Sequence, residues 1–240
     1  IERAVDLFAL EIGMDPVDLR RSHLPSPDAF PFTNGTGTVY DSGDYETALD
    51  LALEAAGYTD LRAEQLRRRE AADRHQLGVG LATYVEITGF GGSEYGKVDL
   101  NSDGTVRAIT GSTPIGTGHV TTWAMLVADR LGVPLDDVEI VYGDTDVVPS
   151  GDTTGGSRSV QLAGSAMADA SDKLSDAARQ VVASMLEASA DDVVLDRDVG
   201  SFHVAGTPVL SRTWAEVAEA VGGPGAVYYT HQTLPTKREL

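Results

Sequence analysis

The stretch from Gly111 to Gly164 constrains the fold more than any other part of the chain. It reads in order as a glycine-rich turn, a helix, a short strand, a polar loop and a second helix. The first turn is Gly116–Gly118, and the loop over residues 153–159 has the letters TTGGSRS. Each stands directly before a helical pattern, so each predicts a helix N-terminus with a partial positive charge. Such junctions bind phosphates and other anions through backbone N–H groups.

The periodicity of the remaining chain predicts an α+β fold. Residues 1–76 read mainly as helices joined by a loop rich in proline, glycine and aromatic side chains. From Leu77 onward, alternating β-branched residues predict a β-meander with a hairpin turn at Asp103 and Gly104. The elements expected after it are helix 119–132, strand 137–142, helix 160–188, a hairpin over 192–204 and helix 213–221.

These patterns predict a chain of three parts. The first is a helical segment with a loop, over residues 1–76. The second is an α+β domain over residues 77–222, with helices packed on a mixed or antiparallel sheet. The third is an irregular tail over residues 223–240, because that stretch has turn signals and no amphipathic pattern.

Charge and composition exclude several classes of protein. The formal net charge is −19, so nucleic acid and anionic membranes are not expected partners. The absence of cysteine excludes disulfides, thiolate metal sites and iron–sulfur ligation by this chain. No apolar run approaches the roughly 20 residues that span a bilayer. The chain shows no signal peptide and begins inside a helical pattern, so we expect a cytoplasmic protein cut from something longer.

The cluster Thr154–Ser159 is the best candidate site in the sequence. Its glycines permit a close backbone approach, its hydroxyls can donate to phosphate oxygens, and Arg158 could form a charge-assisted pair with an anion. An equally good interpretation is a capped helix start at which Arg158 faces an acidic neighbour. His119, at the start of the preceding helix, either lines the same site or is a polar residue near a cap.

Two other groups of charged residues have simpler interpretations. Asp144, Asp146 and Asp152 lie in one loop, but their spacing does not fit a calcium loop, so we favour loop and cap roles. The charged stretch over residues 60–76 favours a solvated helix with pairs such as Glu64–Arg68 over a phosphate-binding patch. No catalytic triad, P-loop or dinucleotide fingerprint is present.

Several motifs occur together in a known order. They are GMDPVDLRRSHL, DAFPFTNGTGTVYDSGDYETALDLAL, GVGLATYVEITGFG, TGSTPIGTGHVTTWAMLVADRLGVP, VEIVYGDTDVVPSGDTTGGSRSVQLAGSA and the TWAEVA helix. In this order the chain resembles the molybdenum-binding large subunit of the xanthine dehydrogenase/aldehyde oxidase family. The likeness is to its branch of carbon monoxide dehydrogenase large-subunit homologues, over roughly residues 1–220.

The resemblance implies a site for molybdopterin with molybdenum, in the cytosine dinucleotide form. The family's two cofactor loops correspond to these positions in the chain: Gly116, Thr117, Gly118, Thr154, Gly156, Ser157 and Ser159. The family hydroxylates aldehydes, heteroaromatic compounds or related small molecules, using oxygen from water. Electrons then leave through iron–sulfur and FAD partners, so such subunits or domains are the expected partners.

The chain departs from the family at several points. Thr117 stands where the family has a glutamine, so one amide donor to the cofactor is missing. The family's catalytic glutamate, in a Gly-x-Gly-Glu context, has no counterpart here, and the N-terminal half of the subunit is absent. We therefore expect a portion of a molybdenum hydroxylase that is incomplete on its own. The alternative is a catalytically silent binding or interaction module that keeps the fold without the cofactor.

Overall fold

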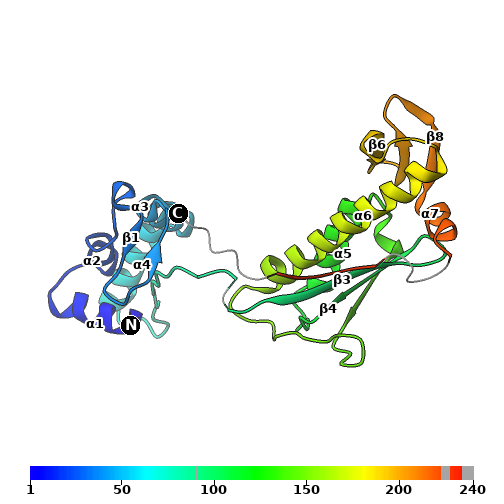
Figure 1. Cartoon of the computed structure of the whole chain (residues 1–240). Helices are drawn as coiled ribbons and strands as arrows, with labels where there is room; N and C mark the ends of the chain where they lie inside the picture. Colours follow the sequence, from blue (N-terminus) through cyan, green and yellow to red (C-terminus); the bar gives the residue numbers. More distant parts are fainter. Residues whose placement is uncertain (90, 223–227, 234–240) are drawn as a thin grey trace. The chain divides into compact units, whose positions relative to one another are not determined.

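The computed structural model describes residues 1–89, 91–222 and 228–233 of the chain. Its helices and strands form two units, Ile1–Val85 and Glu86–Leu240 (Figure 1). Within the described residues, no helix has both the length and the apolar character needed to cross a membrane. The mixture of helices and sheet confirms the predicted α+β class.

The first unit is mainly helical. Asp15 accepts a hydrogen bond from the Val17 N–H and caps the second helix, whose first residue is Pro16. The solvated helix predicted over residues 60–76 is present as far as Glu70, with Arg68 Nε 2.6 Å from a carboxylate oxygen of Glu64. The elements are α1 (Glu2–Glu11), α2 (Pro16–Arg21), a 3₁₀ turn (Pro27–Ala29), β1 (Phe32–Thr33), β2 (Val39–Tyr40), α3 (Tyr45–Ala56) and α4 (Tyr58–Glu70).

A buried guanidinium ties residues 77–85 to this first unit. Arg20 donates to the carboxylates of Glu2 and Asp6 and, at 2.9 Å, to the carbonyl of Leu81. The Thr83 N–H donates to the same Glu2 carboxylate at 3.0 Å. The β-meander predicted from residue 77 is therefore wrong for residues 77–89, which form no strand. Here the Leu81 carbonyl and the Thr83 N–H bond to side chains of Arg20 and Glu2 and not to a neighbouring strand. The domain boundary was predicted after residue 76, whereas the two units divide after Val85.

The second unit is built on a mixed sheet with the strand order β5-β4-β3-β9. Strands β3 (Glu94–Leu100) and β4 (Val106–Thr110) form the predicted hairpin, and β5 (Val138–Tyr142) runs parallel to β4. Strand β9 (Tyr228–Thr233) pairs antiparallel with β3. The stretch 223–240 was expected to be irregular, but this strand lies inside it. The edge of β3 supplies backbone partners that a local sequence pattern does not reveal.

Helices α5 (His119–Leu131) and α6 (Ser165–Met185) pack on the sheet (Figure 1). The helix predicted over residues 160–188 is present as α6 preceded by a π-helical turn, Ser159–Gly164. A Cβ built on Gly96 would lie 2.7 Å from the backbone of Ala166, so glycine lets α6 approach β3 closely. The largest fully buried side chains of this core are Trp123, Phe202, Leu100, Leu131, Met167 and Leu174.

A second, three-stranded sheet extends from the end of α6. Strands β6 (Val193–Asp196) and β7 (Ser201–Val204) are the predicted hairpin, and β8 (Thr207–Thr213) adds a strand that the sequence pattern did not predict. Helix α7 (Trp214–Ala220) begins with a full capping box between Thr213 and Glu216, as its sequence predicted.

Replacing Gly96 by alanine should destabilise the second unit by about 1–3 kcal/mol, because the new methyl group meets backbone atoms of α6. Urea unfolding followed by tryptophan fluorescence measures this loss, since Trp123 and Trp214 both lie in the core of that unit. Gly155→Ala is the matched control, because a Cβ there meets nothing within 4 Å. Equal losses in the two variants would contradict the close approach.

Candidate functional site

The segments that lead into the two predicted loops lie side by side. The first follows β4 and the second follows β5, which runs parallel beside β4. A Cβ on Gly111 would lie 2.4 Å from the Cα of Gly151. The Thr154 hydroxyl donates to the carbonyl of Thr113 at 2.7 Å. Two stretches separated by 41 residues are thus joined by a direct hydrogen bond and a close backbone crossing.

The first turn presents open backbone at the start of α5. Gly116 and Gly118 adopt left-handed conformations with φ of 91° and 80°, and a Cβ on either would meet nothing within 4 Å. No side chain of the described residues caps α5, so the first N–H groups of the helix are left for solvent or a ligand. The Thr117 hydroxyl lies 3.1 Å from a ring nitrogen of His119. That imidazole lies against Trp123, with 5.4 Å between ring centroids.

The hydroxyl groups of the second loop form hydrogen bonds within the protein. Thr154 gives its only proton to Thr113, so Ser159, 2.8 Å away, donates to Thr154. Ser157 donates to a Glu86 carboxylate oxygen at 2.7 Å. None of the three hydroxyls therefore has a proton left for a phosphate, although each can accept a hydrogen bond.

The backbone of the second loop supplies the remaining donors. Gly156 and Ser157 are consecutive left-handed residues, with φ of 54° and 51°. Among the described residues, the N–H groups of Gly155, Gly156 and Ser157 have no hydrogen-bond partner. Successive N–H groups in such a turn form a concavity that binds anions.

Arg158 faces acidic neighbours and does not point to a free anion site. Its side chain is only 4% exposed, lies 2.5 Å from an Asp152 carboxylate oxygen and 3.7 Å from Glu94, and donates to the Ser93 carbonyl at 3.0 Å. The acidic neighbours of Arg158 match that part of the second interpretation of the sequence, but among the described residues no side chain caps the helix start. Arg158 holds the loop in shape through these buried contacts. The prediction that it donates to a phosphate is wrong.

Glu94 is a member of this cluster that the sequence did not single out. It is 1% exposed, and one carboxylate oxygen accepts from the Tyr95 N–H at 2.9 Å. The other oxygen has no hydrogen-bond partner within the part of the chain that the structure describes. Burial raises the pKa of Glu94, against the lowering effects of the Tyr95 N–H and the Arg158 charge. A lone glutamate at the start of a strand carries no sequence signal for this role.

The loop aspartates bond to their own backbone. Asp144 accepts from the Asp146 N–H at 2.9 Å, and Asp152 accepts from the Thr153 N–H at 2.8 Å. The Thr153 N–H, followed by the charge of Arg158, lowers the pKa of Asp152. These contacts are the loop and cap roles that we favoured from the sequence.

Arg158→Leu should lower the free energy of unfolding of the second unit by about 3–5 kcal/mol, because it leaves the buried Glu94 carboxylate without a cation. Adding Glu94→Gln should recover a large part of this loss, since the unpaired charge is then gone. Urea unfolding at neutral pH measures both variants. A double variant that is no more stable than Arg158→Leu would contradict the pairing.

The loss in Arg158→Leu should also depend on pH. A carboxyl with a raised folded pKa contributes stability below its ordinary value of 4.5, and that stability is lost as pH rises through the folded value. Removing Arg158 raises this pKa further, so the destabilisation should be larger at about pH 8 than at about pH 5. The double variant, which lacks the carboxyl, should not show this added dependence in unfolding measurements.

Known proteins share this sequence and this arrangement. The chain is 37% identical to the carbon monoxide dehydrogenase large chain of Afipia carboxidovorans over 92% of its length. It is 36% identical, over 86% of its length, to subunit gamma of the 6-hydroxypseudooxynicotine dehydrogenase complex of Paenarthrobacter nicotinovorans. The crystal structure of quinoline 2-oxidoreductase from Pseudomonas putida 86 matches 98% of the chain with a TM-score of 0.79 and 28% identity.

The chain spans only a part of each of these proteins. It covers 29% of the carbon monoxide dehydrogenase large chain, 26% of subunit gamma and 32% of the quinoline 2-oxidoreductase chain. The predicted resemblance to this group is thus confirmed, and the chain matches a portion of these large subunits.

A profile of one protein family also matches most of the chain. The match covers residues 51–239, which include both glycine-rich loops, the sheet and helices α5 and α6. The family is described as the molybdopterin cofactor-binding domain. With the motif order, the two loops and the relatives all in agreement, this chain belongs to the molybdopterin cofactor-binding domain family.

Proposed function

We propose that the two loops grip the anionic tail of a molybdopterin cofactor through their backbone N–H groups. The observation that carries this proposal is a pair of loops whose preceding segments touch, each with open glycines and with N–H groups that have no partner among the described residues. The residues of the chain fit such a group. Side chains at Gly116, Gly118 and Gly155 would meet no protein atom, so the space beside the backbone is free for a ligand.

The roles of the predicted site residues follow from their hydrogen bonds. Gly116, Thr117 and Gly118 present the start of α5 to the cofactor, and Gly156 and Ser157 present the second turn. Thr154 and Ser159 act differently, because their hydroxyl protons are used within the protein. They hold the second loop against the first and can only accept hydrogen bonds from a ligand.

Main-chain donors also allow a strongly acidic protein to bind an anion. The net charge of −19 repels an anion at long range, and the buried arginine of the second loop is already paired. Backbone N–H groups carry a partial positive charge that needs no counter-ion. They can therefore hold a phosphate in an acidic protein without leaving a charged side chain uncompensated when the site is empty.

The proposed activity is that of one portion of a molybdenum hydroxylase. The bound cofactor supplies two-electron oxidation with oxygen from water, and this chain binds and orients it. By analogy with relatives named for carbon monoxide, 6-hydroxypseudooxynicotine and quinoline, the substrate class is an aldehyde, a heteroaromatic compound or a carbon monoxide-like molecule. The cytosine dinucleotide form, iron–sulfur and FAD partners, the remainder of a large subunit and a cytoplasmic location complete the proposal.

A silent module that keeps the fold without cofactor is the second candidate. The internally bonded hydroxyls and the contact between Thr117 and His119 favour it, because the loops are partly satisfied by the protein itself. Metal analysis for molybdenum, with release of a pterin nucleotide from the protein purified from a host that makes the cofactor, separates the two functions. A folded protein that carries neither supports the silent module.

Gly155→Asp should reduce the molybdenum and pterin content at least about 10-fold, because it places a carboxylate beside the N–H groups of the second turn. The matched control is Gly155→Asn, which has the same shape without the charge. Both should fold, since the position is open and has an ordinary φ. If the two variants retain cofactor equally, the second loop does not bind the anionic tail.

Thr117→Gln should increase cofactor retention, by about 3- to 10-fold, because it restores a side-chain amide donor worth about 1 kcal/mol. The same pterin and molybdenum assay, run after dialysis, measures the change. Thr117→Leu is the control, as it has similar bulk and no donor. A gain in both variants would attribute the effect to bulk and contradict the donor role.

A further inference from the structure

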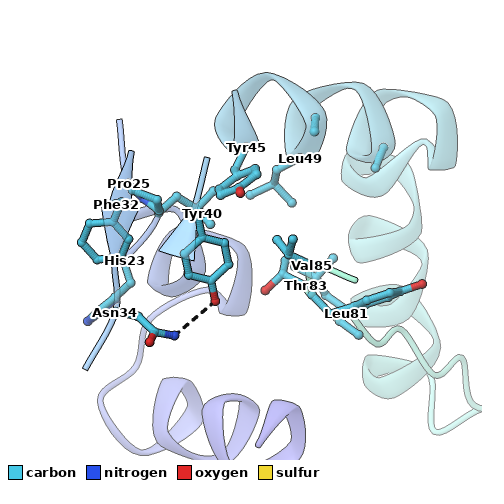
Figure 2. Close-up of a pocket in the computed structure, with 15 residues that line it drawn as sticks. His23, Pro25, Phe32, Asn34, Tyr40, Tyr45, Leu49, Leu81, Thr83 and Val85 are labelled. Carbon is cyan, nitrogen blue, oxygen red and sulfur yellow. Dashed lines mark hydrogen bonds between the residues drawn. The ribbon is translucent and has the colours of Figure 1, made fainter. Parts of the chain in front are cut away.

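The first unit contains a cavity of about 420 Å³ that the cofactor proposal does not use. All its lining residues lie within the first unit, and none belongs to the two loops. Figure 2 shows Tyr40 and Asn34 on one side and Leu81, Thr83 and Val85 on the other. Cavities of roughly 300–1,000 Å³ with mostly apolar walls are typical of small-molecule sites.

Aromatic rings make one wall of this cavity. Phe32 and Tyr40 stack with 6.1 Å between centroids and 24° between planes, and Tyr45 meets Tyr40 edge-on at 6.3 Å. The three rings are neighbours and together form one aromatic face of the cavity. A flat ligand would lie against this face, with ring contacts worth about 0.5–1.5 kcal/mol beyond simple burial.

Helix α3 makes the floor. It turns Tyr45, Ala48, Leu49 and Ala52 to the cavity, at helical spacing. The two alanines are small, which leaves the space above the helix open, while Leu49 is buried beneath it. A larger side chain at either alanine would fill the space without disturbing the helix.

The lining carries no carboxylate, lysine or arginine. The acidic side chains of α3 nearest to it are held elsewhere: Arg21 pairs with Glu46 at 3.1 Å and with Asp50 at 2.5 Å. The lining also includes His23, whose Nδ1 lies 2.8 Å from the Leu19 carbonyl oxygen. A charged ligand would lose its hydration in this cavity without gaining a permanent counter-charge. The chemistry of the lining therefore favours an uncharged molecule.

Among the polar groups of the lining, the Tyr40 hydroxyl is held in place by a neighbouring amide. The Asn34 side-chain amide donates to the Tyr40 hydroxyl at 3.4 Å (Figure 2). Its oxygen is held by N–H and hydroxyl groups of Thr36 and by the Thr38 N–H, so the amide is fixed. The Tyr40 hydroxyl accepts from Asn34 and has no acceptor for its own proton among the described residues. It can donate that proton to a ligand.

We propose that this cavity binds a small uncharged aromatic molecule that carries one hydrogen-bond acceptor. The ring lies on the face made by Phe32, Tyr40 and Tyr45, over the alanines of α3. The acceptor meets the Tyr40 hydroxyl. The site is independent of the cofactor loops, so its test does not depend on whether the chain holds molybdopterin.

Three probes of similar size separate the ligand classes: acetophenone, benzoate and phenyltrimethylammonium. Titration of the full chain, followed by amide chemical shifts of the isotope-labelled protein, should give saturable binding of acetophenone, with shifts at residues 40–52 and 81–85. Benzoate and phenyltrimethylammonium should bind at least about 10-fold more weakly, because their charges are not balanced in the cavity. Absence of saturable acetophenone binding, or tighter binding of either ion, overturns the proposal.

Variants assign the binding to this cavity. Ala52→Leu should weaken acetophenone binding at least about 10-fold by filling the space, whereas Ala55→Leu, on the same helix outside the lining, should leave it unchanged. Tyr40→Phe keeps the ring and removes the proton donor, and should weaken binding about 5-fold. Equal binding by the Ala52 and Ala55 variants would place the probe elsewhere and overturn the assignment.

Discussion

The buried guanidinium of Arg158 is the point on which the arrangement of the cofactor loops depends. It joins the start of β3, through Ser93 and Glu94, to the loop residue Asp152 and to the beginning of α6. A charge with so little exposure must be balanced by partners, so its position is fixed by the carboxylates around it. The backbone on either side of it then has little freedom, and the turn that precedes α6 is presented in one shape.

This arrangement explains why the candidate site uses backbone rather than side chains. The guanidinium of Arg158 is paired with acidic side chains inside the protein. The loop hydroxyls bond to each other and to Glu86. What stays exposed are peptide N–H groups at glycine-rich turns. Their dipoles attract an anion at short range, within a protein whose net charge would otherwise repel it.

Local signals in the sequence predicted the elements whose ends are set locally. Helix α5 ends at Gly132, and α7 begins at the capping box of Thr213, because those residues determine the backbone by themselves. Strand β9 and the strandless segment 77–89 were not predicted, since both depend on partners distant in sequence. The same holds for the site. The two glycine turns were visible in the sequence, but the role of Glu94 and the internal bonds of the loop hydroxyls depend on tertiary contacts.

The left-handed glycines at the two turns have a consequence for how such a site changes during evolution. Recognition by peptide groups survives most exchanges of neighbouring side chains, provided that the unusual torsion angles are kept. A residue such as Thr117, which lies between two of these glycines, can therefore be exchanged while the local shape persists. Searches for distant members of the family should accordingly weigh the spacing of these glycines above the identity of the hydroxyl residues between them.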